Sequence, residues 1–169
     1  MDLIPKPTPG KFRCVTDFKR SGVNEASEIL NYASPNADEH LDFVCGHDLI
    51  SVADAMSFFW QLPLHEDSRN ICAFINKLHL KRYVAVPQGH RNSATHSVQV
   101  VDESLIVEDL KQIWRVYFDD WGNGSDFRHN IDEKYWDFMI ALCTFHCWAL
   151  RYNVRFDPEH AYFGFTKLD

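Results

Sequence analysis

The stretch WRVYFDDWGNGSD, residues 114–126, constrains the fold of this chain more than any other. Residues 113–118 (IWRVYF) predict a β-strand, and the run WGNGSD predicts that the chain turns back in a hairpin. Asp119 and Asp120 lie at that turn. Adjacent carboxylates repel, and burying them without a partner costs several kcal/mol or forces one to take up a proton. The hairpin tip is therefore either solvated, as turn aspartates often are, or compensated by positive charge.

Other segments predict a mixture of helices and strands. Strands are expected at residues 12–18, 49–55, 71–75 and 82–86, and the last two are expected to form a hairpin. The turn-rich segment PTPG should separate the strand at 12–18 from what precedes it. Two further strands, 153–157 and 162–165, are expected to pair in the tail. Helices are expected at residues 25–33, 93–105 and about 127–150. Because these elements follow one another without a regular βαβ repeat, the predicted fold class is α+β.

Length and composition limit the class of protein. The chain has 169 residues, 46% of them hydrophobic, which suffices for one compact domain or two small lobes. No run of about 18 apolar residues occurs, and the start MDLIPKPTPG lacks the order of a signal peptide, so we expect a soluble, intracellular protein without a membrane partner. Five cysteines without framework spacing fit a reducing compartment. The triplet Cys143, His146 and Cys147 has no fourth ligand at zinc-finger spacing and predicts buried helix packing.

Charge is segregated along the chain, whose net charge is -7. Residues 1–24 and 66–91 each carry five basic and two acidic side chains, whereas residues 25–65 carry seven acidic and no basic ones. Residues 92–126 carry seven acidic and two basic side chains. This pattern is either random scatter or a basic lobe, built from two separate segments, that faces an acidic lobe.

Asp54 ends the predicted strand 49–55, and Asp119 and Asp120 lie at the turn of another. If the two strands are neighbours, three carboxylates meet in one small volume. Such a cluster suits divalent cations, because Mg²⁺ binds through a few carboxylates together with substrate phosphates. A pair of ions roughly 4 Å apart can activate an attacking oxygen and stabilise a leaving one.

Five segments, in order, carry a resemblance to a known family: GKFRCVTDFKRSGVN (10–24), DAMSFFWQL (54–62) with HEDSR (65–69), VPQGHRNSAT (86–95), YFDD (117–120) and VRFDPEHAYFGF (154–165). The second resembles a catalytic motif in which an aspartate closes a strand and an aromatic follows five residues later. The third resembles LPQG-x-x-NSP, and the fourth matches the YxDD box. Together they resemble the reverse transcriptase domain of gypsy-class LTR retrotransposons and of retroviruses.

The resemblance implies an architecture and partners. It implies a polymerase palm, an antiparallel sheet packed on helices, formed by residues 29–61 and 93–169, with a small β-rich fingers subdomain formed by 1–28 and 62–92. It implies that thumb, connection and RNase H regions are absent from this chain and supplied in cis or in trans. The implied partners are an RNA or DNA template with its primer and a dNTP. The implied location is the cytoplasm, an element particle or the nucleus.

The resemblance also implies a role for each site residue. Asp54, Asp119 and Asp120 would be the catalytic residues and would hold two Mg²⁺ ions, for which Mn²⁺ can substitute. Tyr117 and Phe118 would lie beside the primer and template, and His160 would be a general acid where the family has lysine. The nucleotide-binding residues would be Lys11, Arg13, Phe59, Gln88 and Gly89. Arg13, Phe59 and Asp119 have plainer interpretations as an exposed strand residue, a core aromatic and a turn aspartate.

The implied function is RNA-directed DNA synthesis by a fingers and palm fragment. Two alternatives belong to other classes. One is a catalytically inactive retroelement remnant that acts as a nucleic-acid-binding or structural module, which Phe58 favours because the family has a small residue there. The other is a metal-dependent nucleotide-binding or phosphohydrolase domain, in which the segment PQG-x-x-NS would have no role.

Overall fold

The computed structural model describes residues 2–6, 9–75, 77–105, 108–126 and 131–166. The chain divides into two compact units, each built from two separate segments: Met1–Tyr32 with Ser57–Ser97, and Ala33–Met56 with Val98–Asp169. Both contain helices and antiparallel strands, so the predicted α+β class is confirmed. Naming the units fingers and palm stays a prediction. Of the helices in the described ranges, none combines the length and apolar character that a membrane span requires.

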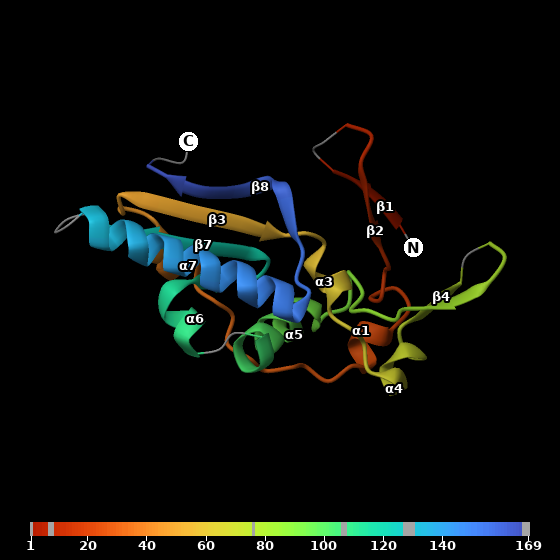
Figure 1. Cartoon of the computed structure of the whole chain (residues 1–169). Coiled ribbons are helices and arrows are strands. Elements are labelled where there is room, and N and C mark those ends of the chain that lie inside the picture. The colour runs from red at the N-terminus through yellow and green to blue at the C-terminus, as the bar shows by residue number, and fades with distance from the viewer. Residues whose placement is uncertain (1, 7–8, 76, 106–107, 127–130, 167–169) are drawn as a thin grey trace. The chain divides into compact units, whose positions relative to one another are not determined.

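The first unit contains two antiparallel hairpins (Figure 1). Strand β1 (Asp2–Pro5) pairs with β2 (Phe12–Val15), and β4 (Ala73–Ile75) pairs with β5 (Leu80–Arg82), which confirms a hairpin near the predicted place. Its helices are short: α1 (Val23–Ala26), α3 (Phe58–Gln61), α4 (Glu66–Arg69) and the start of α5 (Ser93–Val100). Its core contains Phe18, Phe58, Leu62, Cys72 and Val86.

Two expectations for the first unit are wrong. The segment before residue 12 does not separate strand β2 from what precedes it, because β1 pairs with β2 and the Lys6 N–H donates to the Lys11 carbonyl at 2.9 Å. The helix expected at residues 25–33 ends at Ala26. Ser27 leaves the helix in an extended conformation, and Asn92 accepts the Leu30 N–H at 3.2 Å, which holds residues beyond the helix in another path.

The second unit is a four-stranded antiparallel sheet in the order β6-β7-β3-β8. Its strands are β3 (Leu49–Ala55), β6 (Arg115–Tyr117), β7 (Asp120–Ser125) and β8 (Phe156–Phe165). Its helices are α2 (Ala37–Val44), the end of α5, the π-helix η1 (Val101–Leu105), α6 (Glu108–Ile113) and α7 (Ile131–Tyr152). In Figure 1 the long helix α7 runs along the sheet. The strand at 49–55, the helix from 93 and the long C-terminal helix are confirmed.

One face of this sheet is packed with aromatic rings. Trp121 on β7 is fully buried, and its ring centroid lies 4.5 Å from that of Trp148 on α7. Phe145, one turn earlier on α7, stacks on Trp114 at 4.2 Å. Side chains alternate between the faces of a strand, so Asp120, next to Trp121, points to the opposite face. The aromatic face is the main core of this unit.

The other face is partly covered by α2, a helix that the sequence prediction missed. Asn36 caps α2 by accepting the Asp38 N–H at 3.0 Å, and acidic residues follow in the first turn. A Cβ on Gly122 of β7 would collide with Val44 of α2. Glycine at position 122 therefore allows α2 to pack directly against the backbone of the sheet.

The tail forms one strand, β8, and not the expected strand pair. It pairs with β3, but the register shifts: Ala53 lies opposite Ala161, whereas Ala55 lies opposite Phe156. Residues 157–160 therefore bulge out beside Asp54. Pro158 lies in this segment, and proline, which cannot donate to a strand ladder, is typical of such bulges.

Candidate functional site

Asp54 and the Asp119–Asp120 pair lie together at one end of the sheet. In the β3–β7 register Asp54 is directly opposite Asp120, and the Ala55 N–H donates to the Asp119 carbonyl at 2.8 Å. Directly opposite residues of an antiparallel pair have Cβ atoms about 4.5–5.5 Å apart and side chains on the same face. The structure thus brings together all three carboxylates that the sequence singled out as catalytic, while their role stays a prediction.

The turn that carries Asp119 has an unusual backbone. Tyr117 pairs with Asp120, so Phe118 and Asp119 are the two residues of the loop. Phe118 has a φ of 57°, in the left-handed region, which bulky side chains rarely adopt. Two-residue hairpin loops with a positive φ at this position normally have glycine there. Strain of this kind concentrates at functional sites, where the surrounding structure imposes it.

The electrostatics of the cluster favour a cation. The pKa of Asp120 is raised, although the residue as a whole is exposed, because the protein around its carboxyl group desolvates it and because Asp119 and Asp54 add negative charge. Desolvation and the two neighbouring charges each make it unfavourable for Asp120 to ionise beside Asp119 and Asp54. A divalent cation removes the repulsion, and carboxylate oxygens are the ligands that Mg²⁺ prefers. The donor set of Asp54, Asp119 and Asp120 therefore fits the implied magnesium ions.

The bulge in β8 brings two more potential metal ligands, Asp157 and His160, close to Asp54. The carboxylate oxygens of Asp54 and Asp157 and a ring nitrogen of His160 all lie within 4.8 Å of one another. The His160 Nδ1 is 3.2 Å from the Asp157 Oδ2. The sequence prediction included His160 but missed Asp157. The dipeptide Asp157-Pro158 inside an expected strand was the available signal, because it indicates a bulge that redirects side chains.

Behind the turn, Tyr117 contacts two other rings. Its centroid lies 4.9 Å from that of Phe118, edge to face, and 6.1 Å from that of His40 on α2. Burial lowers the pKa of His40, whose Nδ1 has no hydrogen-bond partner within the described ranges. The sequence gave no reason to select His40, because α2 itself was missed. His40 is thus a neutral ring that packs beneath the tyrosine of the YFDD turn.

The nucleotide-binding candidates Lys11, Arg13, Phe59, Gln88 and Gly89 belong to the first unit. Lys11, just before β2, and Arg13, on β2, are both exposed. The chain beyond β2 meets the PQG segment, because the Thr16 N–H donates to the Gln88 carbonyl. Gly89 has a φ of 103°, and a Cβ there would collide with the Thr16 carbonyl oxygen, so this position requires glycine.

Gln88 and the two phenylalanines differ in their surroundings. The Gln88 Oε1 is buried and has no hydrogen-bond partner among the described residues, which leaves an acceptor for a ligand. Phe59 is half-buried. Phe58 is only 2% exposed, so its ring belongs to the core of the first unit.

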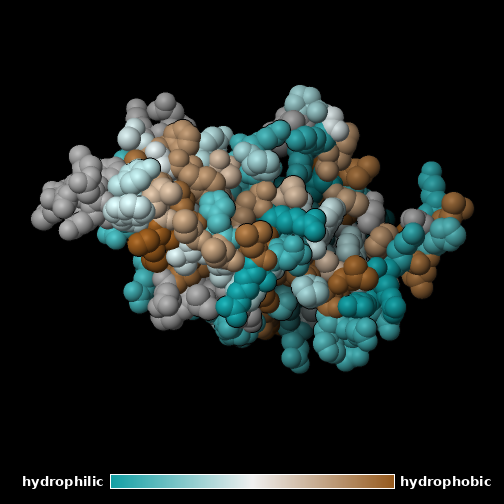
Figure 2. Space-filling model, in the orientation of Figure 1, coloured by the Kyte–Doolittle hydropathy of each residue, from teal (hydrophilic) through white to brown (hydrophobic). Residues whose placement is uncertain are grey.

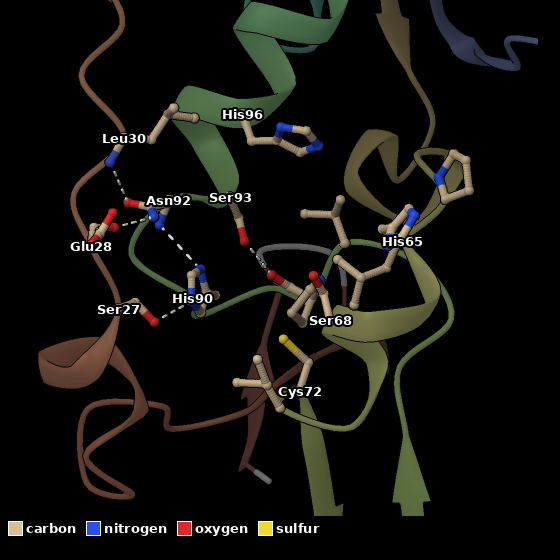
Figure 3. Close-up of a pocket in the computed structure, with 15 residues that line it drawn as sticks. Ser27, Glu28, Leu30, His65, Ser68, Cys72, His90, Asn92, Ser93 and His96 are labelled. Atoms are coloured by element: carbon tan, nitrogen blue, oxygen red, sulfur yellow. Dashed lines mark hydrogen bonds between the residues drawn. The ribbon is translucent and has the colours of Figure 1, made fainter.

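A cavity of about 440 Å³ lies in the first unit next to the PQG segment (Figure 3). His90 closes one side: its Nδ1 accepts the Asn92 N–H at 3.3 Å, so its Nε2 carries the proton and donates to the Ser27 Oγ at 3.1 Å. Ser27 in turn donates to the Val23 carbonyl. Burial, with Arg91 beside it, lowers the pKa of His90. His90 is therefore a neutral side chain that holds Ser27 in place through a hydrogen bond, and it does not act as a base toward the Ser27 hydroxyl.

Asn92 and Ser93 of the same segment also have structural roles. Asn92 donates to the Glu28 carbonyl at 2.7 Å and accepts the Leu30 N–H, and Ser93 donates to the Pro87 carbonyl. In Figure 3 these groups line one wall of the cavity. Asn92 therefore ties residues 28–30 to the start of α5, and Ser93 ties that start to Pro87.

The triplet Cys143, His146 and Cys147 is exposed, so the prediction that it packs in the interior is wrong. Cys143 and Cys147 lie on the side of α7 away from Phe145 and Trp148, which are buried, whereas the His146 ring lies beside those of Phe145 and Phe163, with centroids 5.7 and 5.3 Å away. The sequence prediction placed Tyr135, Phe138 and Phe145 in one apolar stripe of this helix. Phe138 and Phe145 are buried, whereas Tyr135 is exposed, because apolar residues occur on more than one side of α7.

Comparisons with known proteins agree with this fold. No family model matches the chain. The enzymatic polyprotein of Cauliflower mosaic virus (strain D/H) is 32% identical over 111 residues, which cover 66% of this chain and 16% of that protein. The enzymatic polyprotein of Figwort mosaic virus (strain DxS) is 33% identical over 81 residues, or 48% of this chain and 10% of that protein. The chain therefore spans about a sixth or less of the length of these relatives.

Solved structures show the same fold over nearly the whole chain. The foamy viral protease-reverse transcriptase in complex with double-stranded DNA matches with a TM-score of 0.77 and 22% identity, over 95% of this chain and 26% of that one. The same viral protein in complex with an RNA/DNA hybrid matches with a TM-score of 0.67 and 23% identity, over 97% and 19%. This chain is similar to a reverse-transcriptase-related region of retroviral and retroelement polyproteins. The resemblance predicted from the sequence is confirmed at that level, and the gypsy class stays a prediction.

Proposed function

We propose that this chain is the fingers and palm part of an RNA-directed DNA polymerase, which adds dNTPs to a primer 3′-hydroxyl. The observation that carries the proposal is the pairing of Asp54 with Asp120 across β3 and β7, beside the strained Phe118–Asp119 turn. A turn with two like charges and a left-handed phenylalanine is unfavourable for stability, so a functional reason for it is needed. The similarity to reverse-transcriptase structures supplies the reaction class.

Asp54, Asp119 and Asp120 would hold two Mg²⁺ ions, for which Mn²⁺ can substitute. When bound, such ions make a hydroxyl a stronger nucleophile and neutralise charge that develops on a phosphate. Desolvation, together with the negative charges of Asp119 and Asp54, raises the pKa of Asp120, so the chain itself provides a site that lacks positive charge.

The remaining candidates bind substrate or move a proton. Lys11 and Arg13 would bind the triphosphate, since a guanidinium matches phosphate oxygens in a bidentate way. Gln88 and Gly89 would contact the incoming nucleotide, Phe59 would stack under its sugar, and Tyr117 and Phe118 would contact the primer end. His160, held by Asp157 at 3.2 Å, would donate a proton to the leaving pyrophosphate.

The chain spans only part of its relatives, so template, primer and dNTP binding by a longer protein are part of the proposal. Thumb and RNase H regions would be supplied in cis or in trans. The location in which the chain would act is the interior of a cell, either the cytoplasm, an element particle or the nucleus.

Primer extension on poly(rA)/oligo(dT), with Mg²⁺ and with Mn²⁺, tests the proposal. We expect Asp119→Asn and Asp54→Asn to reduce extension at least roughly 100-fold, because each removes a direct ligand, and loss of even an outer-shell partner costs 10- to 100-fold. Asp137→Asn, an exposed aspartate on α7, is the matched control and should retain full extension. Equal extension by wild type and Asp119→Asn contradicts the proposal.

The second candidate is an inactive retroelement remnant that binds nucleic acid or has a structural role. The sequence feature that favoured it, the large ring of Phe58, is accounted for by burial in the core of the first unit. Saturable binding of template-primer without any extension, in both wild type and Asp54→Asn, is the result expected of such a remnant.

A further inference from the structure

Helix α7 has apolar stripes on two opposite sides. The inner stripe, Phe138, Ala141, Phe145 and Trp148, is buried against the sheet. The outer stripe is exposed and consists of Trp136, Ile140, Cys143, Cys147 and Leu150. Since a helix turns by roughly 100° per residue, the two stripes are centred on opposite faces of α7. A helix that is apolar on both sides is normally covered on both sides.

The outer stripe is large and exposed. The exposed fractions of Trp136, Ile140 and Leu150 are 66%, 56% and 82%. In Figure 2, which has the orientation of Figure 1, hydrophobic atoms reach the surface along the region of α7. Single exposed apolar residues are common, but a continuous stripe over four turns of one helix indicates an interaction surface.

The spacing of the outer stripe indicates that its partner is another helix. The successive steps from Trp136 to Leu150 are four, three, four and three residues. This alternation matches the a/d spacing of a coiled coil, in which side chains of one helix pack into holes of another. A flat sheet or an extended peptide does not require that period.

Charges beside the stripe favour a second copy of α7 in antiparallel orientation. Asp137 flanks the N-terminal end of the stripe and Arg151 the C-terminal end, and both are exposed. Antiparallel pairing centred on Cys143 would place each Asp137 near Arg151 of the second copy, whereas parallel pairing would leave these opposite charges at opposite ends of the stripe. We propose that two copies of this chain associate through α7, antiparallel, about a two-fold axis at Cys143. Such an interface is self-complementary, with Trp136 packed against Leu150 of the second copy.

Sedimentation velocity over a range of protein concentrations tests the association. We expect a concentration-dependent dimer, and we expect Ile140→Glu to raise its dissociation constant at least about tenfold, since a carboxylate would be buried in the seam. Ile75→Glu, the same substitution at a residue with an exposed fraction of 78% in the first unit, is the control and should leave the dimer unchanged. Circular dichroism checks that both variants fold. A wild-type chain that is monomeric at all concentrations overturns the proposal.

Thiol cross-linking tests the orientation. Copper phenanthroline should convert two Cys143 thiols, one from each copy, to an intermolecular disulfide that is lost in Cys143→Ser and kept in Cys147→Ser and in Cys45→Ser. Cys45 is exposed but lies outside the stripe. Parallel pairing would instead also cross-link Cys147 to its counterpart, so a dimer cross-linked through Cys147 in Cys143→Ser contradicts the antiparallel arrangement. Because these measurements involve no nucleotide, primer or template, their outcome is independent of primer extension.

Discussion

The two faces of the sheet in the second unit differ in what they contribute. Trp121 is fully buried against Trp148 and Phe145, whereas Asp120, its neighbour in sequence, joins Asp54 and Asp119 on the other face. The aromatic face buries apolar area, and the acidic end gathers groups that repel one another. The stability of the unit therefore comes mainly from the aromatic face, and this allows an unfavourable turn to persist at the other.

Removing the central ring of the aromatic face should have the largest effect. We expect Trp121→Ala to lower the free energy of unfolding by about 3–5 kcal/mol, because it removes a fully buried ring and leaves a cavity. Urea unfolding followed by circular dichroism measures the change. Trp60→Ala, at a ring that is 48% exposed, is the control and should cost much less. Equal losses for the two tryptophans would mean that the aromatic face is not the main core.

A methyl group on the opposite side of the same strand should have the next largest effect. Gly122→Ala would push a Cβ into Val44 of α2, and overpacking of this kind costs about 1–3 kcal/mol. Thermal unfolding measures the loss. Shortening the obstructing side chain in the double variant Gly122→Ala, Val44→Ala should recover part of it. If the double variant is as unstable as the sum of the two single ones, α2 does not pack on Gly122.

Relieving the backbone strain at Phe118, in the turn that carries Asp119, should stabilise the folded chain. Phe118→Gly fits the observed φ of 57° without strain, so we expect the free energy of unfolding to rise by about 1 kcal/mol and the melting temperature by about 2–4 °C. Tyr117→Gly, one residue earlier in β6, should do the opposite, because glycine weakens a strand. Destabilisation by Phe118→Gly as large as that by Tyr117→Gly would show that the turn is not strained.

Neutralising one carboxylate should have a smaller, pH-dependent effect. The pKa of Asp120 is higher in the folded chain than its ordinary value, so the folded state binds protons more readily and loses stability as pH rises through that pKa. In EDTA, Asp120→Asn should therefore melt a few degrees above wild type at neutral pH, and the difference should vanish in acid. Melting temperatures between about pH 3 and pH 8 measure this. A difference in melting temperature that is constant over this range contradicts the raised pKa of Asp120.

The sequence predicted the parts of the fold that depend on local pattern. The strand ending in Asp54, the hairpin of Asp119–Asp120 and the inner apolar period of α7 each follow from a few adjacent residues. It missed parts set by tertiary contacts. Strand β1 is specified by pairing with β2, and α2 by packing on Gly122.

The candidate site divides in the same way. The acidic residues were visible as a motif, whereas Asp157 comes close to Asp54 only because β8 bulges opposite Ala53 and Ala55. The positive φ of Phe118 is imposed by the two-residue loop and has no signature in a phenylalanine side chain.

Binding of Mn²⁺, followed by the loss of the electron paramagnetic resonance signal of the free ion, tests most directly whether the carboxylates of β3 and the turn form one cation site. We predict saturable binding by the wild-type chain and at least roughly tenfold weaker binding by Asp54→Asn and by Asp119→Asn, with Asp137→Asn unchanged. An unchanged Mn²⁺ affinity in Asp54→Asn would contradict the prediction of one cation site, because β3, which carries Asp54, would then contribute nothing to the site.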